Sequence, residues 1–204
     1  MNKSGRIFRW LIPVFAVIVL FGLSIGCGDQ ESQEKAKAEK ANAEKLKTTI
    51  TQVIEEAWNK GNFDVLDNVI AEGYVYHIPP YPDANGLEEY KQRIKSYRSA
   101  YPDLKLAVDG EIIIQGDWAA LRWILTGTHT KPIPSIPIPP TGKKIVIKGC
   151  DMSHWKDGKI LEEWNYADFL GYMKQFGFKM VPPQIEEETK EEEKKDVAKE
   201  AEEK

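Results

Sequence analysis

The sequence predicts an α+β fold in which one curved antiparallel sheet, of about four strands plus a short one, wraps around three N-terminal helices. Helical periodicity of apolar residues dominates residues 46–101, whereas β-branched and aromatic runs dominate residues 104–166. Helices followed by a meander of strands are typical of the α+β class. We therefore expect the sheet to leave a hydrophobic cavity at its open end, beside the long helices.

Three helices are expected before the sheet. The first carries an apolar stripe with helical spacing and ends at Gly61. The stripe consists of Ile50, Val53, Ile54, Ala57 and Trp58. A second, short helix covers residues 63–70. The third begins at Asn85 with Glu88, which resembles a capping box, and extends to residues 101–102.

The strands follow from runs that are rich in β-branched and aromatic residues. A short strand is expected at residues 73–78. Four longer strands are expected at residues 104–115, 118–129, 144–155 and 159–166. Asp157-Gly158 favours a tight type I′ turn between the last two, because both positions of that turn need a positive φ. Asp168 is then placed to cap a last helix, which ends at Gly177.

A proline-rich segment, residues 131–142, interrupts the strands. It alternates five prolines with Ile133, Ile136 and Ile138. This many prolines exclude a central strand and favour an extended polyproline-like backbone. Three isoleucines are costly to leave in water, so we expect them to lie on the rim of the cavity, with the segment acting as a lid.

Composition excludes several classes of function. The net charge of −4 is concentrated in residues 186–204, which contain ten acidic residues and five lysines, so the rest of the chain is nearly neutral. A nearly neutral body predicts no nucleic-acid partner, which would need a basic stripe. The two cysteines exclude a disulfide scaffold, and Cys150 is expected to be a buried, inert thiol. The three histidines lack metal-ligand spacing.

The N-terminus has the pattern of an export signal. Positive residues precede an apolar run at residues 10–25, and the run ends in Leu-Ser-Ile-Gly-Cys, which resembles a bacterial lipobox. We expect cleavage before Cys27 and acylation of its sulfur, which would tether the protein to the membrane of the bacterial cell envelope through a lipid anchor. An uncleaved membrane anchor is the alternative. Because Gly28 rather than Asp follows Cys27, the outer membrane is expected in a Gram-negative cell.

Four regions are therefore expected along the chain. They are a lipoprotein signal peptide at residues 1–26, a charged spacer at 27–45, the folded domain at 46–183 and a disordered acidic tail at 184–204. The spacer is rich in Glu, Lys and Ala, which is typical of a solvated helix or a disordered linker. The tail has too few large apolar residues to bury a core.

Five short motifs in this order resemble the SnoaL-like polyketide cyclase, or ester cyclase, family of the nuclear-transport-factor-2-like superfamily. They lie at residues 58–64, 97–103 (YRSAYPD), 127–130, 139–144 and 157–168. The resemblance implies a cone-shaped, cystatin-like barrel. It also implies chemistry without a metal or an organic cofactor, in which a pocket carboxylate removes a proton α to a carbonyl and starts an aldol ring closure, assisted by a histidine.

The resemblance also proposes the site. The family's catalytic Asp falls on Asn165 and its assisting His falls on Asp151. An amide cannot act as a general base, but Asp151 restores one carboxylate to the pocket. Asp151, Asn165 and His129 are therefore the candidate catalytic residues. The candidate pocket residues are Trp58, Tyr74, Tyr76, His77, Trp123 and Ile136.

A regular hairpin conflicts with this site. A strict two-residue turn at 157–158 would pair Asn165 with Cys150, so that Asn165 and Asp151 would face opposite sides of the sheet. We therefore predict a β-bulge between Ile160 and Asn165, which brings Asn165 and Glu163 round to the side of Asp151. Without such a bulge, Glu163 is expected to be a surface residue like Glu162. His154 is expected to face solvent.

Three functions stay open on the sequence alone. The first is a cofactor-free cyclase, isomerase or hydrolase that acts on a small carbonyl compound, with Asp151 as acid or base. The second is a lipoprotein that binds a small hydrophobic, carbonyl-type ligand without catalysis. The third is an interaction module that forms a homodimer, or binds an envelope partner, through the outer face of the sheet.

Overall fold

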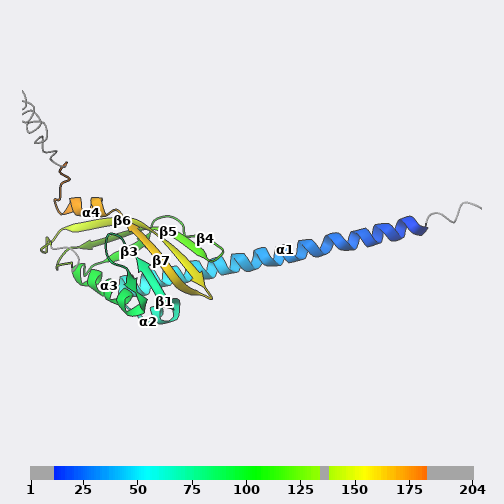
Figure 1. Ribbon diagram of the computed structural model, residues 1–204, viewed down its shortest axis with the longest axis horizontal. Helices are drawn as coiled ribbons and strands as arrows, with labels where there is room; N and C mark the ends of the chain where they lie inside the picture. The colour runs from blue at the N-terminus through cyan, green and yellow to red at the C-terminus, as the bar shows by residue number, and fades with distance from the viewer. Residues whose placement is uncertain (1–11, 134–137, 183–204) are drawn as a thin grey trace, which may run out of the picture.

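The fold is an open, curved sheet with the N-terminal helices packed on one side, as Figure 1 shows for the computed structural model, which describes residues 12–133 and 138–182. The helices are α1 (Ile12–Val53), the π-helix η1 (Ile54–Lys60), α2 (Asp64–Val69), α3 (Gly86–Ala100) and α4 (Phe169–Gln175). The strands are β1 (Ile70–His77), β2 (Ala84–Asn85), β3 (Lys105–Val108), β4 (Ile113–Gln115), β5 (Trp118–Thr128), β6 (Lys144–Lys156) and β7 (Lys159–Ala167). The predicted α+β class is confirmed.

The described strands form one sheet in the order β2-β1-β7-β6-β5-β3, and β4 also pairs with β5. The long antiparallel ladders β5–β6 and β6–β7 confirm the predicted meander. Two details differ from the expectation. β1 pairs with β7 in parallel, and the strand expected at 104–115 is two strands, because the backbone turns at Gly110 with a φ of 101°.

The core lies between the helices and the sheet. The stripe predicted on the first helix is buried from Leu46 through Ile50 and Val53 to Ala57 and Trp58. The inward residues of β5 and β6 alternate with exposed ones, as expected for a sheet with one covered face. The helices therefore close one side of the sheet and define the inner surface of the cone.

Helix α1 is continuous from the apolar N-terminal run into the domain. In Figure 1 most of its length projects away from the sheet. Residues 30–42 are exposed, so the predicted charged spacer is a solvated helix over this stretch. Within the described part of the chain, no helix is both long and apolar enough to cross a membrane. Residues 1–11 and 183–204 lie outside the described residues, and the signal peptide, acylation of Cys27 and the tail stay predictions.

The β6–β7 hairpin has the predicted irregularity. Asp157 and Gly158 both have a positive φ, 51° and 78°, as a type I′ turn requires. Trp155 pairs with Ile160, but His154 then pairs with Glu162. Residue 161 is therefore an extra residue on β7, and every residue after it has changed face.

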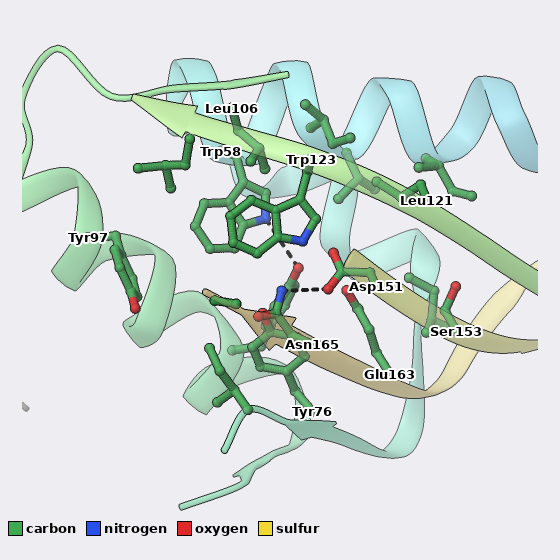
Figure 2. Close-up of a pocket in the computed structure, with 18 of the residues that line it drawn as sticks. Trp58, Tyr76, Tyr97, Leu106, Leu121, Trp123, Asp151, Ser153, Glu163 and Asn165 are labelled. Carbon is green, nitrogen blue, oxygen red and sulfur yellow. Dashed lines mark hydrogen bonds between the residues drawn. The ribbon is translucent and has the colours of Figure 1, made fainter. Parts of the chain in front are cut away.

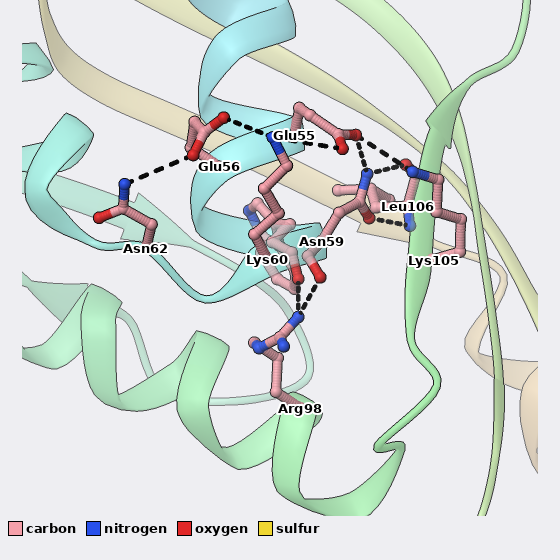
Figure 3. A network of polar contacts seen from close by, with 9 residues as sticks. Glu55, Glu56, Asn59, Lys60, Asn62, Arg98, Lys105 and Leu106 are labelled. Atoms are coloured by element: carbon pink, nitrogen blue, oxygen red, sulfur yellow. Dashed lines mark hydrogen bonds and ion pairs between the residues drawn. The ribbon is translucent and has the colours of Figure 1, made fainter.

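A polar network fixes η1 to β3, as Figure 3 shows. The side chain of Asn59 pairs with the backbone of Leu106 as a neighbouring strand would. The Leu106 N–H donates to Asn59 Oδ1 at 2.7 Å, and Asn59 Nδ2 donates to the Leu106 carbonyl at 3.0 Å. Asn59 therefore completes the hydrogen bonding of an edge strand and holds the neighbouring Trp58 against the core.

Arg98 closes the C-terminal end of η1 from α3. Its Nη1 donates to the carbonyl oxygens of Trp58 (2.6 Å) and Asn59 (2.7 Å), which have no partner within the helix. Gly61 is required here for two reasons. Its φ is +78°, and a Cβ on it would lie 2.8 Å from Arg98 Nε. The motif at 58–64 is therefore a structural joint between η1, α3 and β3.

The structure tests two predicted helix caps and the predicted burial of Cys150. The Asp168 cap is confirmed, because the Gly171 N–H donates to its Oδ1 at 2.8 Å. The capping box at Asn85 is wrong: Glu89, not Glu88, accepts from the Asn85 N–H, and the Asn85 side chain caps nothing. The expectation for Cys150 is also wrong. Cys150 is exposed, because Asp151 next to it faces the inside of the sheet.

We expect Asn59→Ala to lower the free energy of unfolding by about 2 kcal/mol, because it leaves the Leu106 N–H and carbonyl without partners. Urea denaturation followed by tryptophan fluorescence would measure the change. Asn68→Ala, an exposed position in α2, is the matched control and should change little. An Asn59→Ala protein as stable as the wild type would show that Asn59 does not support β3.

Candidate functional site

A cavity of about 80 Å³ lies inside the cone, between η1, α3 and strands β5 to β7 (Figure 2). Its wall is largely aromatic and aliphatic, with polar groups from β6 and β7. The polar side chains are Asp151, Ser153, Glu163 and Asn165. At roughly 10–15 Å³ for one water, the cavity has room for several water molecules or a small organic group.

The extra residue at position 161 assembles the polar part of the wall. With this bulge, Asp151 pairs with Asn165 and Ser153 pairs with Glu163, so all four share the inner face. In the regular ladder, Glu163 and Asn165 would point outward. The sequence-based prediction that Asp151 and Asn165 face one cavity is therefore confirmed as geometry, while their catalytic roles stay a prediction.

The indole ring of Trp123 forms another wall of the cavity, and Gly149 makes room for it. A Cβ at Gly149 would lie 2.3 Å from the ring and 2.7 Å from the Tyr166 carbonyl oxygen. Gly149 pairs directly with Trp123 across β5 and β6. The absence of a side chain at 149 therefore lets the ring lie over the strand and close the cavity beside Asp151.

Two carboxyl groups meet in this cavity. Figure 2 shows the side chains of Asp151 and Glu163 pointing toward each other. Asn165 Nδ2 donates a hydrogen bond to Asp151 Oδ1, and the Tyr74 hydroxyl donates to Glu163 Oε2 at 2.7 Å. Each carboxyl therefore accepts a hydrogen bond from a neutral side chain, the Trp123 N–H lies close to Asp151 as well, and neither carboxyl has a cationic partner among the described residues.

Burial without a cation makes both carboxyl groups weak acids. Burial raises the pKa of Asp151 well above its ordinary value, and the charge of Glu163 raises it further, although hydrogen bonding from Asn165 and the neighbouring Trp123 indole N–H lowers it. Burial raises the pKa of Glu163 to about 7, against a lowering effect of Tyr74. Two like charges this close cannot both form easily, so the pair shares a proton near neutral pH.

Two polar atoms on the cavity wall lack a partner in the described structure. They are the indole Nε1 of Trp123 and the amide Oδ1 of Asn165, and both are buried. A buried donor and a buried acceptor without partners are unfavourable unless water or a ligand completes them. The cavity therefore offers one N–H donor and one acceptor to a guest, next to the carboxyl pair.

Several predicted pocket residues do line the cavity. Trp58, Tyr76 and Trp123 form part of its wall. Trp58 Nε1 donates to the Tyr90 hydroxyl at 3.2 Å, so this ring is fixed by α3. Tyr74 is buried one layer behind the wall and acts through Glu163 rather than through contact with the cavity.

The two histidines predicted in the site lie elsewhere. His129 is buried between Tyr101 and Phe176, and its Nδ1 contacts Thr141 Oγ1 at 3.2 Å. It joins the end of β5 to the end of the proline-rich segment. His77 lies on the outer face of β1, between Asp83 at 3.0 Å and Glu162 at 2.8 Å. Strand alternation explains His77, because Tyr74 and Tyr76 take the inward positions.

The proline-rich segment is placed only in part. Ile133 and Ile138 are buried, which agrees with the expectation that they avoid water, and Ile136 lies outside the described residues. Neither buried isoleucine lines the cavity itself. Ile133 instead lines a neighbouring groove with residues of α3, so the segment does not cover the cavity directly where it is described.

The sequence of the folded domain matches a protein-family model. The model of the SnoaL-like polyketide cyclases matches residues 48–176, which is most of the folded domain. The chain belongs to this family. Membership supports a cyclase-type function and fits the cone-shaped fold. No curated protein matches the chain.

Several solved structures share the fold. A polyketide cyclase candidate from Acidithiobacillus ferrooxidans is 32% identical with a TM-score of 0.57, and the match covers 64% of this chain and 93% of that one. TsrD from Streptomyces laurentii is 27% identical with a TM-score of 0.55, covering 64% and 96%. IdmH from Streptomyces antibioticus, also a polyketide cyclase candidate, is 27% identical with a TM-score of 0.54, covering 65% and 99%.

Sequence reasoning gave Glu163 too small a part in this SnoaL-like site. The sequence argument turns Glu163 inward with the bulge but gives it no role in the site, whereas in the structure it is a buried carboxyl on the cavity wall. The available signal was the hairpin itself, because any bulge that turns Asn165 inward also turns Glu163 inward. His154, which is expected to face solvent, lies on the outer face but is half-buried because its ring stacks on Trp118.

Glu163 should make the protein less stable as the pH rises. The carboxyl has a pKa of about 7 when folded, above the ordinary 4.5, so the folded state binds the extra proton between these values. Its contribution is full below about pH 4.5 and falls as the pH passes 7, by on the order of 3 kcal/mol. Glu163→Gln should therefore match the wild type at pH 5 and exceed its unfolding free energy at pH 8.5.

Urea denaturation at the two pH values measures this difference. Glu72→Gln, an exposed position on the same neighbouring strand as Tyr74, is the control and should follow the wild type. If Glu163→Gln destabilises the protein equally at both pH values, the Glu163 carboxyl is not a buried weak acid.

Proposed function

We propose that this domain is a cofactor-free acid–base enzyme of the cyclase type, which removes a proton α to a carbonyl group of a small substrate. The observation that carries the proposal is the pair of buried carboxyl groups, Asp151 and Glu163, that faces one largely apolar cavity. A shared proton gives the pair a base and an acid at the same pH. Acid–base chemistry near neutral pH needs both.

The pair supports the following proton transfers. The ionised carboxylate accepts the α-proton, and the electrons of the broken C–H bond form the C=C bond of an enol. The carbonyl oxygen receives the proton of the other carboxyl group, which completes the enol, and the Trp123 N–H beside Asp151 can donate a hydrogen bond to the same oxygen. In a cyclisation the enol carbon then attacks a second carbonyl of the same molecule, and the new alkoxide is protonated.

Asn165 has a positioning role in this proposal. Its Nδ2 donates to Asp151, which holds that carboxyl on the cavity wall and lowers its pKa. Its Oδ1 is free to accept a hydrogen bond from a substrate hydroxyl. The amide at this position therefore does not remove acid–base function from the site, because Glu163 supplies the second carboxyl group.

The activity test uses heptane-2,6-dione, a small diketone that can close to a six-membered ring. In D₂O, NMR follows exchange of its α-protons and formation of the cyclic enone. We expect the wild-type protein to accelerate exchange over buffer. Asp151→Asn and Glu163→Gln should each lower the rate by about 10²- to 10⁴-fold.

Glu162→Gln is the matched control, because Glu162 precedes Glu163 on β7 and contacts His77 on the outer face. It should leave the exchange rate unchanged. If the wild type gives no exchange above buffer but still binds the diketone, the apolar cavity is a binding site for a carbonyl ligand and the enzyme proposal fails.

We also propose that the domain is exported and lipid-anchored through Cys27. The support comes from the sequence, in which a positive and then apolar segment ends in a lipobox-like motif. The exposed helical stretch at residues 30–42 fits a spacer between a membrane anchor and the folded domain. A domain held in this way would meet its substrate at the cell envelope.

Cys27→Ser tests the anchor. Because the thioether needs the cysteine sulfur, the variant should remain at precursor size on gel electrophoresis and should not incorporate labelled palmitate in a bacterial host. Cys150→Ser is the matched control and should be processed like the wild type. A Cys27→Ser protein that is still cleaved and acylated would refute the lipoprotein proposal.

A further inference from the structure

A second depression adjoins the cavity. It is a groove of about 380 Å³ between α3, the residues that precede it and the start of the proline-rich segment. Its described lining is Tyr81, Ala84, Glu88, Glu89, Gln92, Arg93, Ser96, Tyr97 and Ile133. Tyr97 lines both the groove and the inner cavity. The Tyr97 side chain is therefore the partition between the two spaces.

Arg93 supplies the groove with a positive charge that no carboxylate of the described residues neutralises. One guanidinium nitrogen, Nη2, donates to the Pro82 carbonyl at 2.9 Å. The Nε atom is buried and has no hydrogen-bond partner. Among the described residues, no carboxylate forms an ion pair with Arg93. A half-buried guanidinium in this state can gain a charge-assisted hydrogen bond from an anionic guest.

The positive charge of Arg93 acts on two tyrosines of the groove, Tyr97 and Tyr81. Burial raises the pKa of Tyr97, and Arg93 opposes this change. Burial also raises the pKa of Tyr81, and Arg93 again opposes it. Both hydroxyl groups thus stay protonated and able to donate beside Arg93. The groove combines a planar cation with two neutral donors, a set that suits a carboxylate.

The two glutamates on the groove do not supply the missing partner. Glu89 accepts from the Asn85 backbone N–H at 2.7 Å, and Glu88 is 3.3 Å from Lys91 Nζ. Both are exposed, so water screens them more than it screens the buried Arg93 Nε. They weaken the positive field at the rim without cancelling it at the guanidinium.

We propose that this groove binds a carboxylate group of the substrate through Arg93, while the carbonyl end passes Tyr97 into the inner cavity. The inference rests on the proposed function, because it names the substrate class as a keto acid. Arg93 and Tyr97 are four residues apart on α3 and so lie on one face of the helix. A short apolar chain lying along the Tyr97 ring joins the two ends.

The inner cavity and the groove differ in charge, and this difference fixes the orientation of the proposed substrate. The described wall of the inner cavity already holds two carboxyl groups and no cation, so it disfavours a third negative group. The groove holds the unneutralised Arg93. An anionic end therefore stays outside Tyr97, and the neutral carbonyl end reaches Asp151 and Glu163.

The test compares 5-oxohexanoate with its neutral methyl ester as ligands for the full-length protein. Dissociation constants are measured by NMR titration at pH 7.5 in Asp151→Asn, so that no turnover interferes. We expect the carboxylate to bind at least tenfold more tightly than the ester, and Arg93→Gln to abolish that preference. The Arg93 Nε–H signal, identified by its loss in Arg93→Gln, should shift with the carboxylate and not with the ester.

Arg122→Gln is the matched control, because Arg122 is an exposed arginine beside Asp109 and is not among the residues that line the groove. It should keep the preference for the carboxylate. If Arg93→Gln does not fold, the dissociation constants of the Asp151→Asn protein alone test the proposal. Equal affinity for the carboxylate and the ester would overturn it. If the wild-type protein does not accelerate exchange of the diketone protons, the enzyme proposal fails. A preference for the carboxylate over the ester would still show an anion-binding groove at Arg93.

Discussion

One extra residue on β7, at position 161, is the constraint on which the site depends. It changes the face of every later residue in the strand, so that Glu163 and Asn165 join Asp151 and Ser153 on the inner wall. The tight turn at Asp157-Gly158 fixes the register from the other end, so the bulge cannot be absorbed by a longer loop. The carboxyl pair is a direct result of this local change in pairing.

The rest of the scaffold holds the aromatic wall against that pair. Asn59 and Arg98 secure η1 from two sides, which fixes Trp58, and Gly149 leaves space for Trp123. These contacts are backbone-directed, so they define positions more strictly than apolar packing alone. Trp58 and Asn59 both belong to the π-helix η1, with Trp58 on the cavity wall and Asn59 bonded to β3 (Figure 3).

The fold was predictable because the spacing of apolar residues and the turn residues indicate its helices and strands. The bulge was predictable because two sequence arguments about Asp151 and Asn165 conflicted. Regular alternation placed Asp151 and Asn165 on opposite faces, while the family resemblance placed them together, and only an inserted residue satisfied both. The histidines were not predictable in this way. His129 and His77 lie at strand ends, where one residue of register decides between core, cavity and outer face. Arg93 had no signal at all, because an unneutralised charge is visible only once its surroundings are known.

The amide at position 165 follows from the carboxyl at position 163. With Asp in place of Asn165, three carboxyl groups would face a cavity of about 80 Å³ that has no cation on its described wall. Each added negative charge raises the cost of the others in a low-dielectric space. A neutral amide at 165 instead donates to Asp151 and leaves one proton to be shared by two carboxyl groups. The amide at position 165 therefore keeps the number of carboxyl groups on the described cavity wall at two, Asp151 and Glu163.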